Sequence, residues 1–223
     1  MNEVEFKYNL RSEIRAITTI YENYTFFKTM NYGVCYPSIS EEAKRLLILD
    51  ASGQKAISLL IQEFEPIFES EIEIYKQGLL IAQNNWTKIE QDFFNTLKKS
   101  TRLQVLGKYK GLISLYGPGG SFYEPDEISI RLNPKNQKDA AEANLTIAHE
   151  IIHLAISDLV MEHKLRFEDI ERVVDLILTK TELRSLFADP KMQDMGNPAM
   201  DSIFQKKNYN VKEAIREFAF IND

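Results

Sequence analysis

The chain has 223 residues, of which 44% are hydrophobic and 27% charged, so it can bury one sizeable core or two small lobes. Its net charge of −6 at pH 7 and the lack of a strong basic block argue against nucleic-acid binding. The single cysteine excludes an intrachain disulfide framework, and because no long apolar run or signal-peptide pattern is present, we expect a cytoplasmic protein without a membrane span.

Residues 1–105 are predicted to be mainly helical. Helices are expected over 40–49, over 53–82 with an interruption at its proline, and over 85–97, where apolar side chains share one face. The aromatic-rich stretch 21–36 is interpreted as part of the core, because clustered aromatic side chains are usually buried against one another.

Two strand-like runs follow, at residues 111–116 and 127–132. In the second run Ile128 and Ile130 alternate with Ser129, which is the pattern of a half-buried strand. Glycine and proline between the runs predict a turn-rich loop, and this loop has no phosphate-binding motif. An Asn-Pro-Lys-Asn sequence then ends the second run and supplies an N-cap for the next helix.

That helix carries His149-Glu150-Ile151-Ile152-His153, an H-E-x-x-H motif in a chain with only 3 histidines. Histidines four residues apart lie on one side of a helix, so their rings can converge on one metal ion. Glu150 sits about 100° further round the helix, where it can reach a water beside the metal. The helix is apolar on most sides, which predicts that its narrow polar stripe faces a cleft.

A catalytic zinc site needs at least three protein ligands. Downstream of the motif, residues 167–178 form a second amphipathic helix, in which Glu171 lies at the border of the apolar arc while Asp169 and Arg172 point away from it. Glu171 is therefore the acidic side chain that is best placed to face inward. His163, ten residues past the motif, and the other downstream acidic residues stay open as alternatives.

Together, H-E-x-x-H and a later helix carrying Glu-x-x-x-Asp resemble the gluzincin zinc metallopeptidases, with a thermolysin-like or minigluzincin-like catalytic core. The resemblance covers residues 110–180 and implies one Zn²⁺ per chain, held by His149, His153 and Glu171. It also implies that Asp175 accepts the free ring N–H of His149, the usual partner of a metal-bound histidine.

The predicted strands and helices, together with this resemblance, indicate an α+β fold. The resemblance implies a zincin-like core over residues 106–223, preceded by the mainly helical region 1–105 or continuous with it as one domain. A small antiparallel or mixed sheet would lie beside the active-site helix. By resemblance, 127–132 would be the edge strand along which an extended peptide binds. A plain hairpin packed on the helices is the alternative.

The activity that the resemblance implies is zinc-dependent hydrolysis of a peptide or protein substrate. Glu150 would take a proton from the attacking water and pass it to the leaving amine. Tyr209, the only tyrosine after Glu171, is the expected donor to the oxyanion. The glycine-rich segment 117–121 lacks the pattern of the exopeptidase motif found in aminopeptidases of this group, which favours endopeptidase action.

Other functions remain open from the sequence. A zinc-binding but catalytically quiet zincin-like protein would act through partner binding, with the helical first half as its docking surface. A helical structural domain without metal is a third interpretation, and a peptide deformylase is disfavoured because Cys35 lies far from the motif. The helical region 1–105 could also act as a self-inhibiting segment that covers the cleft. We also expect the loop 189–198 to line that cleft.

Overall fold

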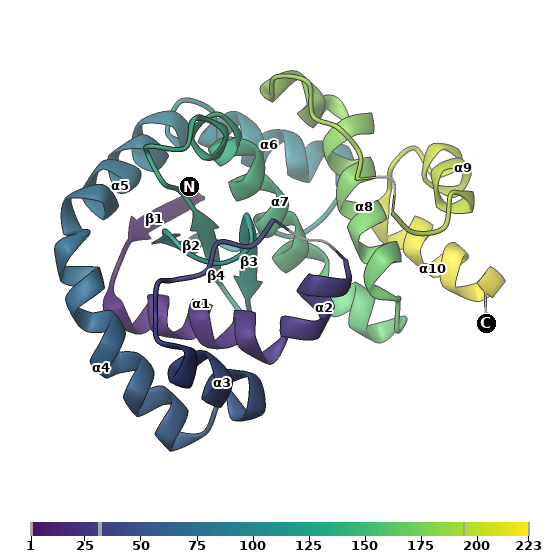
Figure 1. The fold of residues 1–223 in the computed structure, drawn as a ribbon. Helices are drawn as coiled ribbons and strands as arrows, with labels where there is room; N and C mark the ends of the chain where they lie inside the picture. The colour runs from purple at the N-terminus through teal and green to yellow at the C-terminus, as the bar shows by residue number, and fades with distance from the viewer. Residues whose placement is uncertain (1, 31–32, 194, 223) are drawn as a thin grey trace.

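The structure is a computed structural model that describes residues 2–30, 33–193 and 195–222 (Figure 1). It is an α+β fold, mostly helical, with a small mixed sheet, as the sequence predicts. The described strands are β1 (Glu3–Lys7), β2 (Lys108–Ser114), β3 (Gly120–Tyr123) and β4 (Glu127–Arg131). The described helices are α1 (Leu10–Glu22), α2 (Tyr24–Thr29), α3 (Glu41–Asp50), α4 (Gln54–Ser70), α5 (Ile72–Trp86), α6 (Glu90–Thr101), α7 (Gln137–Glu162), α8 (Phe167–Lys180), the 3-10 helix η1 (Glu182–Leu186), α9 (Ala199–Lys206) and α10 (Val211–Asn222).

The sheet has the strand order β1-β2-β4-β3. β1 and β2 are parallel, β2 and β4 are parallel, and β3 joins β4 as an antiparallel neighbour. β1 cannot be predicted from the sequence, because its five residues show too short a pattern and pair with a remote segment, so that Glu3 lies opposite Lys108. One sheet therefore contains residues from both the first and the second half of the chain.

β4 lies inside the sheet and not at its edge. It pairs with β2 on one side and with β3 on the other, so the prediction that 127–132 form an edge strand is wrong. Ile128, Ser129 and Ile130 are buried between these neighbours. The edge beside the motif helix is β3, in a stretch predicted to be a loop. Alternation within one strand shows which side chains face the core, but not how many strands pair with it.

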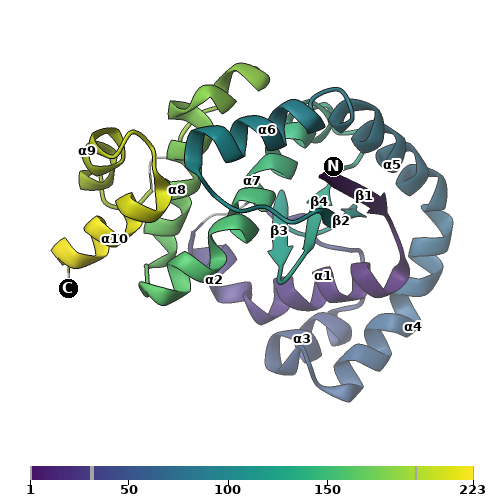
Figure 2. The same cartoon turned by 180° about the vertical axis from the view of Figure 1, so that it is seen from behind.

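α7 packs against β3 and β4 and also contacts α5 and α8. Its Ile147, Ile151 and Ile152 are fully buried, as expected for a helix that is apolar on most sides. Figures 1 and 2 show α8, α9 and α10 gathered at the side of the molecule away from β1. A second, smaller core lies between α1, α3, α4 and α5 and includes Phe64 and Tyr75.

The region 1–105 contains α1 to α6 in addition to β1, so its mainly helical character is confirmed. The interruption predicted at the proline of 53–82 is displaced, because α4 continues through Pro66 and the break falls at Glu71. Within the described part of the chain, no helix has both the length and the apolar composition needed to cross a membrane.

Candidate metal centre

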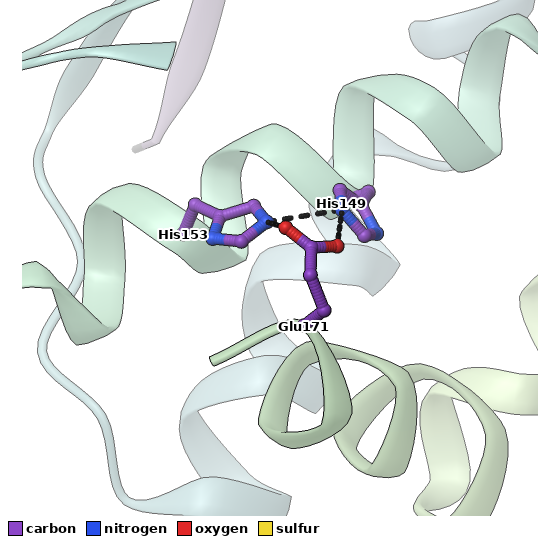
Figure 3. A group of neighbouring side chains, drawn as sticks. All are labelled: His149, His153 and Glu171. Carbon is purple, nitrogen blue, oxygen red and sulfur yellow. Dashed lines mark hydrogen bonds and ion pairs between the residues drawn. The ribbon is translucent and has the colours of Figure 1, made fainter. Parts of the chain in front are cut away.

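α7 begins at the predicted place. Its N-cap residue is Asn136, whose side chain accepts a hydrogen bond from the backbone N–H of Lys138 at 3.0 Å. The helix then continues without a break through the motif, so His149 and His153 lie one turn apart on it and face α8 (Figure 3).

The two motif histidines and Glu171 meet between α7 and α8 (Figure 3). The Nε2 atoms of His149 and His153 lie 3.0 Å apart. Glu171 places Oε2 3.3 Å from His149 Nε2 and Oε1 3.2 Å from His153 Nε2. One ligand atom from each residue lies within 4.8 Å of the other two. The structure thus brings together the three residues that the resemblance suggests as metal ligands.

The charges of these three residues favour a cation between them. Burial raises the pKa of Glu171, but hydrogen bonds from His149 and His153 outweigh it, so the net pKa is lowered and the carboxylate stays ionised. A buried carboxylate needs a positive partner, which protons on the rings or a metal ion would supply. Two imidazole nitrogens and one carboxylate are a ligand set of catalytic zinc, and the residues therefore fit that ion.

Glu150 is buried beside the ligands, and it lines the same cleft. Burial raises the pKa of its carboxyl group above the usual value, while the charges of the two motif histidines oppose that rise. Gly120 of β3 makes the room for this carboxylate, since a Cβ added there would lie 2.3 Å from Glu150 Oε1. The edge strand and the motif helix are therefore in direct contact at this point.

Phe122 of β3 is a site residue that the sequence analysis missed. Its ring stacks on the imidazole of His153, with centroids 4.8 Å apart and an angle of 9° between the planes. This contact fixes the plane of a candidate ligand ring. Because the stretch around Phe122 is predicted as a loop, the sequence contains no signal that would bring this side chain to His153.

Asp175 does not make the hydrogen bond that the resemblance implies. It is buried and lines the cleft, but its Oδ2 accepts from the backbone N–H of Gln193 at 2.5 Å, and among the described residues no hydrogen bond joins it to His149. Burial raises the pKa of Asp175, and the Gln193 hydrogen bond opposes this. Nδ1 of His153 is likewise buried without a hydrogen-bond partner in the described part of the chain.

Two other candidates from the sequence lie elsewhere. Tyr209 follows α9 with a φ of 57°, packs against the main core, and is not among the described residues that line the cleft. His163 caps the C-terminal end of α7 and is not part of the ligand group. Among the described residues, the tyrosine that lines the cleft is Tyr123 of β3, and Arg15 lies over its ring at 3.9 Å.

The cleft has a volume of about 1010 Å³ and opens over the ligand group. One wall is formed by Thr19 of α1 and by Phe26 and Phe27 of α2. Phe26 also contacts Phe167 at the start of α8, edge to face, with ring centroids 5.3 Å apart. The interpretation of 21–36 as core therefore holds for Tyr21, which is buried, but not for these two phenylalanines; Tyr32 lies outside the described residues.

The loop between η1 and α9 also reaches the cleft, as predicted for 189–198. Pro190, Lys191 and Gln193 line it. The side-chain amide of Gln193 donates to Glu171 Oε2 at 3.1 Å. Polar loop residues are common, so the sequence did not single out this glutamine.

Comparison of the chain with protein-family models, with curated proteins and with solved structures gave no match.

Proposed function

We propose that this protein is a zinc metallopeptidase that hydrolyses peptide bonds and has a zincin-like core. The observation that carries the proposal is the convergence of His149, His153 and Glu171, with the carboxylate of Glu150 beside them in a large cleft. When bound, zinc supplies Lewis-acid polarisation of a water and of a substrate carbonyl. The three ligand side chains hold the ion, and Glu150 moves the proton.

Glu150 is suited to act as a general base. A carboxylate with a pKa raised by burial accepts a proton more readily than an exposed one. In the proposed reaction it takes one proton from water as the water oxygen bonds to the carbonyl carbon. It then delivers that proton to the amine when the C–N bond breaks.

β3 is the strand along which we propose that the substrate binds. It pairs with β4 on one side only, and its residues 120–123 line the cleft. An extended peptide can therefore add to its other side through main-chain hydrogen bonds. Endopeptidase action remains part of the proposal, because the glycine-rich segment 117–121, which leads into β3, does not contain the exopeptidase pattern.

Metal binding is the first test of the proposed function. Purified protein is expected to contain close to one zinc per chain, and His153→Ala is expected to lose it, because two ligands are too few for a stable site. His163→Ala is the matched control and should keep its zinc, since that ring lies outside the ligand group. Metal analysis of the three proteins measures this directly. Absence of zinc from the wild type after reconstitution would overturn the proposal.

Cleavage is tested separately, with the zinc-loaded protein and a broad library of peptides. Hydrolysis within the peptides that stops on addition of a chelator supports an endopeptidase. Zinc bound without any cleavage would instead favour the catalytically quiet protein that acts through partner binding.

Gly120→Ala should impair catalysis more than folding. The added Cβ would lie 2.3 Å from Glu150 Oε1 and 2.7 Å from Thr146 Cγ2, so the carboxylate and the Thr146 side chain must both move, while the three residues expected to hold zinc are left in place. A displacement of about 1 Å can lower turnover about 100-fold. Gly119→Ala is the control, because nothing lies within 4 Å of a Cβ added there. Turnover and Tm of both variants would be compared with the wild type, and equal turnover in all three would contradict the assignment of Glu150.

A further inference from the structure

One side of α8 carries charged residues that are buried. Asp169, Arg172 and Asp175 are 3%, 6% and 3% exposed, although Asp169 and Arg172 point away from the apolar arc of the helix. On an uncovered helix such residues would face solvent. Buried charges need partners, and here the loop between η1 and α9 supplies them.

The loop follows α8 in a regular register. The backbone N–H of Gln193 donates to Asp175, the carbonyl of Met195 accepts from Arg172 at 2.9 Å, and the backbone N–H of Asn197 donates to Asp169 at 2.8 Å. Each step of two residues along the loop, from 193 to 195 to 197, thus corresponds to a step of three residues back along α8, from 175 to 172 to 169. The loop backbone is held to α8 at three points.

Two further contacts hold the loop in this position. Arg172 also forms a two-point ion pair with Asp201 of α9, through distances of 2.6 and 2.9 Å. Gly196 has a φ of 73°, and a Cβ there would lie 2.4 Å from the carbonyl oxygen of Glu168. Only glycine allows the loop to approach α8 this closely.

With its backbone held in this way, Gln193 reaches the ligand group. Its amide donates to Glu171 Oε2, the oxygen that lies 3.3 Å from His149 Nε2. We propose that Gln193 is a positioning residue, which fixes the orientation of the Glu171 carboxylate for metal binding. This inference rests on the proposed function, since it assigns a role toward the same metal.

The physical reason lies in the donor that Gln193 supplies. A glutamate side chain has several rotamers, and a hydrogen bond to one oxygen selects among them. Partners that orient a metal ligand in this way typically change metal affinity about 10- to 100-fold when they are removed. Because Gln193 is exposed at the cleft surface, it can be replaced without opening the core.

The test is the zinc affinity of the full chain, measured by competition with a chromogenic chelator. Gln193→Ala is expected to raise the dissociation constant about 10- to 100-fold. Gln193→Met keeps nearly the size of the side chain but removes the hydrogen-bond donor, without adding a charge that would itself attract Zn²⁺. It should bind zinc about as weakly as the alanine variant, whereas a purely steric role would leave its affinity unchanged.

Lys191→Ala is the matched control, because Lys191 lines the same cleft from the same loop and its ion pair is with Asp189. It should bind zinc as the wild type does. Thermal unfolding of the zinc-free proteins checks that the loop and the core are intact. A wild type that binds no zinc would overturn the proposed function, whereas tight binding by the wild type and both Gln193 variants alike would overturn this inference alone.

Discussion

Glu150→Gln is expected to keep close to one zinc per chain while its peptide-bond turnover falls about 10²- to 10⁴-fold, the usual contribution of a general base. Glutamine has the same shape as glutamate but cannot take the proton from water. The variant should also fold at least as well as the wild type, because burial already disfavours the charged form of this carboxyl group.

Zinc content, kcat and Tm of the wild type and Glu150→Gln together test this expectation. The matched control is Glu142→Gln, which changes a glutamate of the same helix that also lines the cleft but is exposed. Its turnover should stay close to that of the wild type. Full activity in Glu150→Gln would exclude the proposed mechanism even if zinc binds as expected.

The second large effect concerns Glu13, a buried carboxyl group that is far in the sequence from His149, His153 and Glu171. It lies on α1, where it accepts hydrogen bonds from the hydroxyl of Ser114 and the backbone N–H of Leu115, both at 2.8 Å. Burial is the dominant influence, and it raises the pKa of Glu13 to about 7 from the usual 4.5.

This shift makes the stability of the protein depend on pH. The folded state holds the proton of Glu13 more tightly than the unfolded state does, so the stabilising contribution is complete below pH 4.5 and is lost as the pH rises through about 7. The difference between the two pKa values corresponds to roughly 3 kcal/mol. Glu13→Gln imitates the protonated form and should remove this contribution to the pH dependence.

Urea unfolding of the zinc-free proteins at pH 5 and pH 8 measures the effect. The free energy of unfolding of Glu13→Gln, relative to the wild type, should rise by roughly 2.5 kcal/mol between the two pH values, because a small part of the contribution is already lost at pH 5. Glu65→Gln, on the exposed side of α4, serves as the control, and its difference from the wild type should change little. A constant difference for Glu13→Gln as well would show that Glu13 is ionised in the fold throughout.

Local geometry was sufficient to predict that the side chains of His149, His153 and Glu171 lie close together. The spacing of His149 and His153 places them one turn apart on any helix, and the apolar pattern of α8 turns Glu171 inward. The same local reasoning predicted the N-cap at Asn136, the strand β4 and the mainly helical first half, although Ser129 of β4 is buried and not on an exposed face as the alternation suggested. These features depend on residues within a few positions of one another.

Contacts between residues that are remote in the sequence determined the sheet and the surroundings of the candidate site. β1 and β3 are too short to show a pattern, and pairing with strands elsewhere in the chain makes them strands. That pairing places β4 inside the sheet and brings Phe122 and Gly120 of β3 against His153 and Glu150.

The hydrogen-bond partners of the buried polar side chains on α8 also come from a segment that is remote in the sequence. A helical wheel shows that Asp169 and Arg172 avoid the apolar arc, but not that a loop covers them. It is this loop that takes the hydrogen bond of Asp175, which the resemblance assigned to His149, and that brings Gln193 to Glu171. By itself, then, the sequence determined the helices and which of their side chains converge between α7 and α8. Only the tertiary structure decided what surrounds them, because the energies of burial and of hydrogen bonding between distant segments depend on which segments meet.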